Sequence, residues 1–168
     1  IIGAGGFARL HTQEICRIKD AEVKVICDCY LEKAKKLADE FYISDYCTDY
    51  NEAISRDDVD IVVVATNDQT HCEATIAALK AEKHVLCEKP MAVNAREAEE
   101  MFDCAKANGV LLMEAMWARL VPGTLKMLEL VENGVLGDIL GVEGKFCYTM
   151  DEDEMDHHVF KPENGGGS

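Results

Sequence analysis

The stretch Ile1-Ile-Gly-Ala-Gly-Gly-Phe-Ala8 decides the fold that we expect for this chain of 168 residues. Two apolar residues lead into the pattern Gly-x-Gly-x-x-Ala, and apolar residues at helical spacing continue beyond it. In turns of this kind the first glycine permits a tight turn, the second lets the backbone approach a pyrophosphate, and a small third residue lets the helix pack on a sheet. The sequence therefore predicts a dinucleotide-binding turn that consists of Gly3, Gly5, Gly6, Phe7 and Ala8.

Asp28 lies at the end of the next apolar segment, residues 22–28, which reads as a strand. An acid about 20 residues after such a turn accepts hydrogen bonds from a ribose 2′-hydroxyl, and its charge repels a 2′-phosphate. Cys29 follows it, so no arginine is adjacent to neutralise a phosphate. We therefore expect NAD as the cofactor, while Lys33 and Lys35 keep NADP open; the alternative for Asp28 is a solvated strand end.

Strands and helices alternate along the first two thirds of the chain. Further β-rich apolar segments cover residues 60–66, 84–87 and 110–113, and helical spacing appears over 31–41 and 74–81. Asn94 with Glu97 forms a capping box, and Gly109 is placed to end that helix. This alternation predicts an α/β Rossmann fold with a doubly wound parallel sheet.

The regular alternation of short strands and helices ends after residue 117. A helix is predicted from Pro122 to Gly134, and one long strand over residues 138–148. We expect a cofactor-binding domain over 1–117, with its first strand truncated to Ile1-Ile2, and the incomplete beginning of a second α+β domain over 118–168.

Composition restricts the partners. The chain has 17 Lys and Arg against 32 Asp and Glu, a net charge of −15, which disfavours nucleic acid and anionic membranes. No apolar run approaches the ~20 residues that cross a bilayer. The eight cysteines are scattered singly, which favours reduced thiols and a cytoplasmic protein, and no spacing indicates a metal site.

The tetrapeptide Cys87-Glu-Lys-Pro90 follows the strand predicted over 84–87. Ligands of open α/β sheets bind beyond the carboxyl ends of the strands, so Glu88 and Lys89 are expected beside the cofactor. A lysine there can hydrogen-bond a substrate hydroxyl and help to move its proton. The alternative is a surface lysine before a proline that ends the strand.

With these motifs the chain resembles the glucose–fructose oxidoreductase and inositol dehydrogenase family, called Gfo/Idh/MocA. Within this family it is most similar to the branch of dimeric dihydrodiol and xylose dehydrogenases. The resemblance covers almost the whole chain in the family's order, and its most specific element is Glu-Lys-Pro after a Lys-His-Val strand. The segments that carry it are Ile2-Gly-Ala-Gly5, Ala65-Thr-Asn67 with His71, Lys83–Pro90, Glu114–Arg119 and Pro162–Gly167.

The resemblance implies roles for residues that spacing alone does not assign. Lys89 is the catalytic lysine, and Thr66 and Asn67 lie along the cofactor, although the family commonly has proline where this chain has Asn67. His71 takes a cofactor-side or active-site role; the alternative is a histidine at the N-terminus of a helix without a catalytic function. The resemblance also implies that Trp117 and Arg119 contact the nicotinamide half of the cofactor. Phe146 would line the substrate pocket, although it equally fits the core of a strand.

Two functions from different classes follow. The first is an NAD(P)-dependent dehydrogenase that moves hydride between the nicotinamide and a hydroxyl-bearing carbon of a sugar, polyol or dihydrodiol, acting as a homodimer through its second domain. The second is a non-catalytic dinucleotide-binding regulator of the same family. A methyltransferase or another doubly wound domain gives no reason for Glu88-Lys-Pro90 and is disfavoured. In the family, the glycines at 165–167 lead into a helix that completes the active site, and that helix lies beyond this sequence.

Overall fold

A parallel sheet with strand order β2-β1-Ile2-β3-β4-β5 forms the centre of the first of two structural units. The computed structural model describes residues 1–145 and residue 147, and its first unit spans Ile1–Ala115. The second unit begins at Met116. The strands are β1 (Val25–Cys27), β2 (Asp45–Cys47), β3 (Ile61–Val64), β4 (His84–Cys87) and β5 (Leu112–Glu114).

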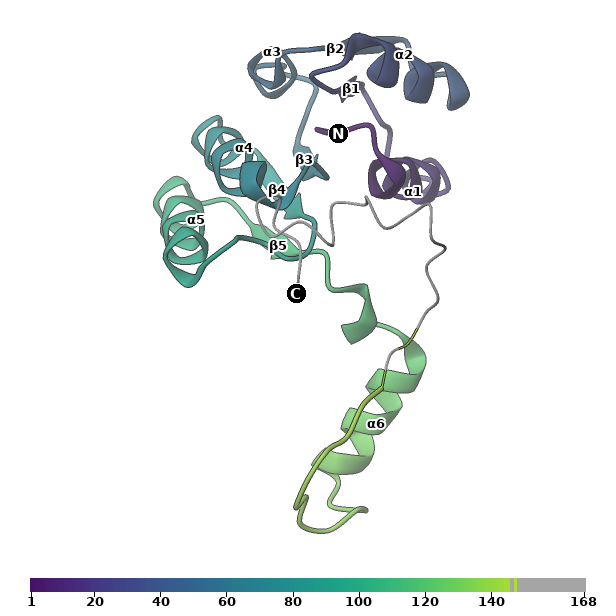
Figure 1. Ribbon diagram of the computed structural model, residues 1–168, viewed down its shortest axis with the longest axis vertical. Helices are drawn as coiled ribbons and strands as arrows, with labels where there is room; N and C mark the ends of the chain where they lie inside the picture. The colour runs from purple at the N-terminus through teal and green to yellow at the C-terminus, as the bar shows by residue number, and fades with distance from the viewer. Residues whose placement is uncertain (146, 148–168) are drawn as a thin grey trace. The chain divides into compact units, whose positions relative to one another are not determined.

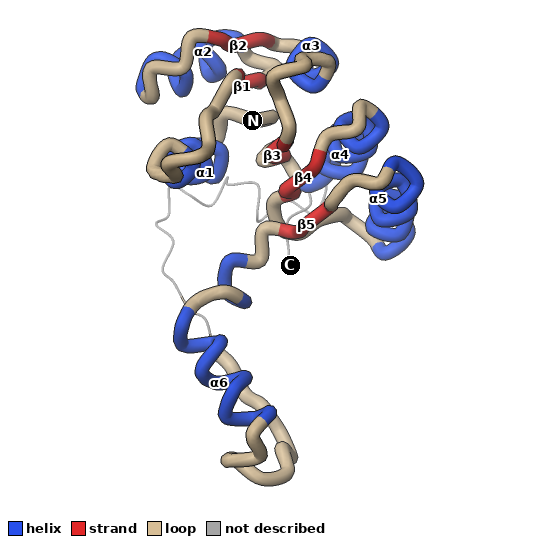
Figure 2. Tube along the Cα trace, turned by 180° about the vertical axis from the view of Figure 1, so that it is seen from behind, coloured by secondary structure: helices blue, strands red, loops and turns tan. Residues whose placement is uncertain are grey.

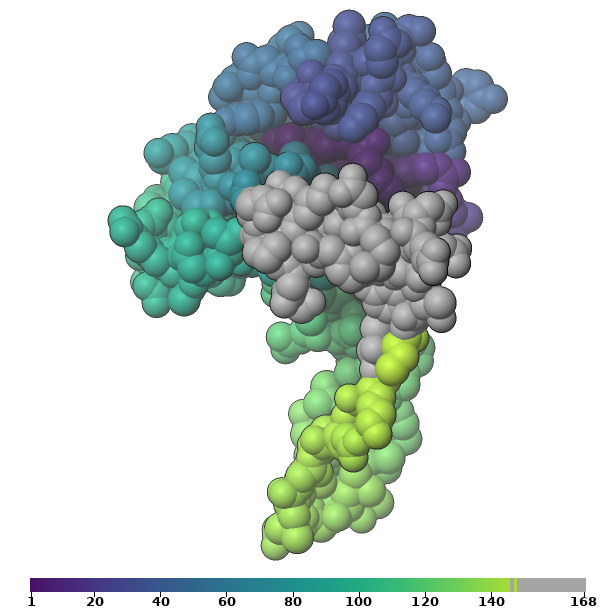
Figure 3. Space-filling model, viewed as in Figure 1, coloured from purple at the N-terminus to yellow at the C-terminus, as the bar shows by residue number. Residues whose placement is uncertain are grey.

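Ile1 and Ile2 occupy the middle of this sheet, between β1 and β3, as Figure 2 shows from behind. The Ile2 amide donates to the Val63 carbonyl at 2.8 Å, and the Cys27 amide donates to the Ile1 carbonyl at 2.8 Å. In Figure 3 the purple N-terminal residues are visible between the blue segment that follows and the teal residues of β3 and α4. The predicted first strand, although reduced to two residues, therefore takes the central position of a doubly wound sheet.

Helices cover both faces of the sheet (Figure 1). One face carries α1 (Gly6–Ile15) and α2 (Leu31–Glu40), and the other carries α3 (Tyr50–Ile54), α4 (Asp68–Lys80) and α5 (Ala95–Asn108). In β3, Val62 and Val64 pack towards α4 and α5, whereas Val63 packs towards α1 and α2. Burial on both faces explains the continuous apolar run, and the predicted Rossmann fold is confirmed.

The helix after the glycine turn forms where expected, but of the apolar residues at helical spacing, Phe7, Leu10, Ile15 and Ile18, only Ile15 packs against the core. Phe7, Leu10 and Ile18 are each about half exposed, at 48%, 51% and 56%. The fully buried residues of α1 are small, namely Ala8 and Thr12, and Ile15 packs beside them while partly exposed. The Thr12 hydroxyl donates to the Ala8 carbonyl at 2.8 Å. Small side chains let a helix approach a sheet closely, and hydrophobic periodicity alone does not reveal this.

Helix α5 has the predicted ends. The Asn94 side chain accepts from the Glu97 amide at 3.0 Å, and Gly109 adopts the left-handed conformation with φ +67°. The edge strand β2 and the short helix α3 were not predicted, because neither is long enough to display a clear period.

The second unit contains a short 3₁₀ helix, η1 (Trp117–Arg119), and α6 (Pro122–Glu132), which begins at a proline as predicted. The long strand expected over 138–148 is not formed in the part of that range that the structure describes, 138–145 and 147. A strand is held by hydrogen bonds to a neighbouring strand, and the described part of this unit offers none. Within the described residues, no helix is long and apolar enough to span a membrane.

Candidate functional site

Four segments of the first unit meet at the carboxyl edge of the sheet. The glycine turn follows Ile2, Asp28 follows β1, Thr66 comes after β3, and Glu88 with Lys89 follows β4. The chain leaves Ile2 towards β1 and β2 on one side, and later continues from β3 to β5 on the other. This edge is a topological switch point, the place where open α/β sheets bind their ligands.

Gly3 is constrained by its backbone and by its neighbours. Its φ is +105°, a conformation that other residues rarely adopt, and its amide donates to the Cys27 carbonyl at 2.7 Å. A Cβ atom at Gly3 would collide with the Ala65 carbonyl oxygen. Only glycine therefore fits where the central strand turns between β1 and β3.

Gly5 and Gly6 differ from Gly3, because a Cβ atom at either would meet nothing within 4 Å. Gly5 is the N-cap of α1 and no side chain caps this helix start, so its first amides remain available. A helix N-terminus with exposed amides and an open approach suits an anionic pyrophosphate. The side chain of Phe7 is half exposed in this first turn, and Ala8 is fully buried against Ile26 and Val63.

Asp28 lies at the carboxyl edge of the sheet and hydrogen-bonds to the glycine turn. One carboxylate oxygen accepts from the Ala4 amide at 2.8 Å, and the other accepts from the Tyr30 amide at 2.9 Å. The Cys29 thiol also donates to the second oxygen at 3.7 Å, so the oxygen that accepts from Ala4 is the one with a further lone pair for an incoming hydroxyl. Nearby, the Lys33 ammonium lies 4.6 Å from the centre of the Tyr30 ring, and Lys35 pairs with Asp39 at 3.4 Å.

The turn after β4 is tightly held at Glu88. This residue is 6% exposed, and its carboxylate accepts from His11 Nε2 at 2.8 Å and from the Lys89 amide at 3.1 Å. Burial acts to raise the pKa of the Glu88 carboxyl, but these two hydrogen bonds and the positive charges of His11 and Lys89 outweigh it, so the pKa lies below its ordinary value. Glu88 is therefore a carboxylate at neutral pH.

Lys89 projects towards the glycine turn. Its ammonium lies 4.6 Å from the centre of the Phe7 ring, which belongs to the first turn of α1. The side chain is partly exposed, so the amine is accessible at the edge where the glycine turn opens. This places an amine beside the uncapped N-terminus of α1.

His71 lies beneath this edge and contacts backbone on both sides. It is 1% exposed, with Nδ1 2.9 Å from the Pro90 carbonyl oxygen and Nε2 3.3 Å from the Thr66 carbonyl oxygen. Both partners are acceptors, so a protonated ring nitrogen donates to one of them. Both ring nitrogens contact backbone carbonyl groups in this structure, and the cofactor-side or active-site role expected for His71 stays a prediction. These contacts connect the segment after β3 to the turn after β4.

Thr66 and Asn67 form the start of α4. Thr66 accepts a hydrogen bond from the Thr70 hydroxyl at 2.8 Å, and the Asn67 carbonyl accepts from the Thr70 amide at 2.9 Å. Asn67 is the N-cap residue, but its exposed side chain makes no capping hydrogen bond. The amide group of Asn67 is therefore exposed at this edge and is not used to cap α4.

This geometry agrees with comparisons to known proteins. Residues 1–116 match the family described as an oxidoreductase family with an NAD-binding Rossmann fold. The chain belongs to this Gfo/Idh/MocA family. It is 33% identical over 152 residues to trans-1,2-dihydrobenzene-1,2-diol dehydrogenase of Mus musculus, and the match covers 89% of this chain and 46% of the mouse protein. The chain therefore spans about half the length of such a relative.

Solved structures give the same family. Levoglucosan dehydrogenase in complex with NADH and levoglucosan has a TM-score of 0.77 and 30% identity, covering 83% of this chain and 40% of that protein. A 3-ketoreductase from Actinomadura kijaniata, in complex with NADP and TDP-benzene, has a TM-score of 0.74 and 30% identity, covering 80% and 41%. Relatives therefore occur in complexes with either nicotinamide cofactor, and the resemblance stated from the sequence is confirmed.

The remaining predicted residues lie outside the first unit of this Gfo/Idh/MocA chain. Trp117, which is 64% exposed, and Arg119 belong to η1 in the second unit. Phe146 lies outside the described residues, as does the segment 162–167 that contributed to the resemblance. Their expected contacts with cofactor and substrate stay predictions.

Two residues of the site were not predicted. His11 binds Glu88 at the start of the turn formed by residues 88–91 after β4 (the lysine turn). The Glu114 carboxylate accepts from the Met91 amide at 2.8 Å and so holds the end of this turn. The helical spacing of four between Phe7 and His11 could have indicated that both face the same way. Glu114 lay within a segment that carried the resemblance, but its contact gave no sequence signal.

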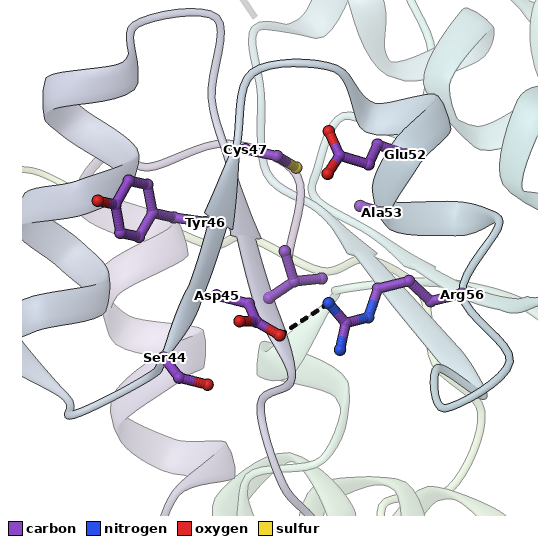
Figure 4. Close-up of a pocket in the computed structure, with 8 residues that line it drawn as sticks. Ser44, Asp45, Tyr46, Cys47, Glu52, Ala53 and Arg56 are labelled. Atoms are coloured by element: carbon purple, nitrogen blue, oxygen red, sulfur yellow. Dashed lines mark hydrogen bonds and ion pairs between the residues drawn. The ribbon is translucent and has the colours of Figure 1, made fainter.

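A surface hollow of about 420 Å³ lies elsewhere, along the edge strand β2 and α3 (Figure 4). Arg56 extends across it and pairs with Asp45 at 2.8 Å, the contact dashed in Figure 4, and Asp58 binds the same guanidinium at 2.8 Å. Both carboxylates satisfy the charge of Arg56. None of the residues predicted for cofactor or catalysis lines this hollow.

Proposed function

We propose that residues 1–117 are the cofactor domain of an NAD(P)-dependent dehydrogenase whose second domain begins at residue 118. The enzyme transfers hydride between the nicotinamide and a hydroxyl-bearing carbon of a sugar, polyol or dihydrodiol. The observation that carries the proposal is the position of Lys89, which stands at the switch point beside the first turn of α1. The dihydrodiol and levoglucosan dehydrogenases among the relatives support this substrate class.

The residues at the edge suit a dinucleotide. The uncapped start of α1 with the open glycines 5 and 6 suits the pyrophosphate, and Asp28 suits a ribose hydroxyl. The carboxylate of Asp28 would repel a 2′-phosphate, which favours NAD over NADP, although a related ketoreductase carries NADP. Thr66 and Asn67 border the same edge, and Trp117 and Arg119 would complete the nicotinamide side.

When bound, the nicotinamide supplies the hydride chemistry. The contribution of the chain is to hold the reacting groups and to move a proton. In its neutral form the Lys89 amine would accept a hydrogen bond from the substrate hydroxyl and take up its proton as hydride leaves the carbon for the nicotinamide. In the reverse direction the ammonium would return the proton. Glu88, His71 and Glu114 hold the turn from which Lys89 projects.

The full-length protein tests the proposal. Purified protein is assayed with NAD and NADP against a panel of sugars, polyols and dihydrodiols, beside the variant Lys89→Met. We expect the variant to bind NAD with unchanged Kd while kcat falls about 100- to 10,000-fold, the usual contribution of a general acid–base group. A protein that binds NAD and turns over no member of the panel would instead be a dinucleotide-binding regulator.

The same proposal includes assembly and location. A small-molecule substrate, a homodimer formed through the second domain and a cytoplasmic location fit the family resemblance and the scattered free cysteines. Sedimentation of the full-length protein measures the oligomeric state.

A further inference from the structure

Helix α1 contacts Glu88 and Lys89, the first two residues of the lysine turn. Phe7 and His11 are one helical turn apart and therefore share a face of α1. The Phe7 ring lies 4.6 Å below the Lys89 ammonium, and His11 Nε2 lies 2.8 Å from a carboxylate oxygen of Glu88. Two side chains of α1, Phe7 and His11, thus contact two consecutive residues of the lysine turn. The same helix begins at the open glycines 5 and 6.

The Glu88 carboxylate is the link in this arrangement. Its side chain is 8% exposed, and an ionised carboxylate only accepts hydrogen bonds. One oxygen accepts from His11 and the other accepts from the Lys89 amide at 3.1 Å. A buried carboxylate without its donor is strongly disfavoured, so loss of His11 would drive Glu88 to rearrange and release the Lys89 amide.

We propose that His11 is a positioning residue for Lys89. Through Glu88 it sets the lysine turn in register with α1, so that the amine stands at a defined place relative to the dinucleotide that the glycine turn would hold. This inference rests on the proposed function, because it assumes that Lys89 moves the proton. It assigns a role to a residue on the first helix that does not itself touch cofactor or substrate.

A second ion pair between α1 and another element offers a matched control. Arg9 pairs with Glu40 of α2, at positions that are 48% and 37% exposed, and its guanidinium lies near the Phe41 ring. Among the described residues, neither partner belongs to the lysine turn. Arg9→Gln therefore removes an ion pair from the same helix without touching Glu88. His11→Gln keeps an N–H donor at a similar reach, whereas His11→Ala removes it.

A first measurement follows the turn directly and needs no cofactor. Hydrogen exchange of the full-length protein is read by mass spectrometry on peptides that contain residues 88–91. We expect the Lys89 amide to exchange at least about tenfold faster in His11→Ala, and to be protected in His11→Gln and Arg9→Gln as in the wild type. Equal protection of this amide in all four proteins would overturn the proposal.

A second measurement separates positioning from a general loss of structure. We expect His11→Ala to lower kcat about 10- to 100-fold, the effect of a small misplacement of a catalytic group, with Kd for NAD changed less than about threefold. His11→Gln should recover most of kcat. In the Lys89→Met background, His11→Ala should cause no further loss, because the two residues act through the same group.

The outcomes distinguish this inference from the proposed function. If Lys89→Met keeps wild-type kcat, the proposed function fails. If Lys89→Met loses activity while His11→Ala keeps it, the function stands and the role of His11 is refuted. If His11→Ala and His11→Gln lose kcat and thermal stability to the same extent, His11 is structural only and the inference is equally refuted.

Discussion

The Nδ1 atom of His71 lies 2.9 Å from the carbonyl oxygen of Pro90, the residue that follows Lys89. The histidine belongs to α4, so this contact ties the start of one helix to the turn after β4. The hydrogen bond from the Met91 amide to the Glu114 carboxylate holds the next residue of the same turn. Two consecutive residues after Lys89 are therefore held by α4 and β5. The lysine is thus displayed on a turn that distant segments support.

Replacement of His71 should therefore affect stability first. We expect His71→Ala to lower the free energy of unfolding by about 2–4 kcal/mol, because it opens a cavity and leaves one of the two carbonyls that His71 contacts, Thr66 or Pro90, without its donor. His71→Asn keeps a donor near the position of Nδ1 and should cost less. Urea unfolding measures both variants. A large fall in kcat for His71→Ala at unchanged stability would instead indicate a direct catalytic role.

The glycines of the turn should separate folding from binding. We expect Gly3→Ala to destabilise the protein by about 2–4 kcal/mol, because the new methyl group meets the Ala65 carbonyl at a positive φ. Gly5→Ala should cost less than about 1 kcal/mol, because its Cβ enters open space at an N-cap. It should nevertheless weaken NAD at least about tenfold, if the pyrophosphate approaches there. Thermal unfolding and NAD titration together decide between these expectations.

Asp28 should determine the choice of cofactor. We expect Asp28→Asn to weaken NAD about tenfold and to reduce the preference for NAD over NADP by a similar factor, because a charge that repels the 2′-phosphate is lost. Calorimetric titration with each cofactor measures both affinities. The control is Asp39→Asn, since Asp39 pairs with Lys35 at the surface of α2. Tighter binding of NADP than of NAD by the unchanged protein would contradict the role assigned to Asp28.

Glu88 should make the protein sensitive to acid. Its pKa in the folded state lies below the ordinary value of 4.5, so the unfolded state binds the proton more readily. The stabilisation is therefore complete above the ordinary value and is lost as the pH falls through the lower folded value. We expect the free energy of unfolding of the wild type to fall more steeply below about pH 4.5 than that of Glu88→Gln.

Urea titrations between about pH 3 and about pH 7 measure these slopes. Glu99→Gln, at an exposed position of α5, provides the matched control and should keep the slope of the wild type. Parallel curves for the wild type and Glu88→Gln would show that the buried carboxylate does not contribute to the pH dependence.

Much of the fold and part of the site could be predicted from local sequence patterns. The glycine turn, the run of apolar residues in β3 and the capping box at Asn94 each depend on residues close together in the chain. Sterics and hydrogen bonding act at this range, so the sequence shows them. The Glu88-Lys-Pro90 motif after β4 was likewise visible, and with it the candidate lysine.

The tertiary structure alone decided which of these residues act together. His11 and Glu88 are separated by 77 positions, and no period or spacing in one sequence links them. The burial of His71 and the small-residue face of α1 similarly depend on what the folded sheet brings against them. By itself the sequence determined the turn, the strand alternation and the motif, because these are local. Which side chains support the lysine was decided by packing between segments that only folding brings into contact.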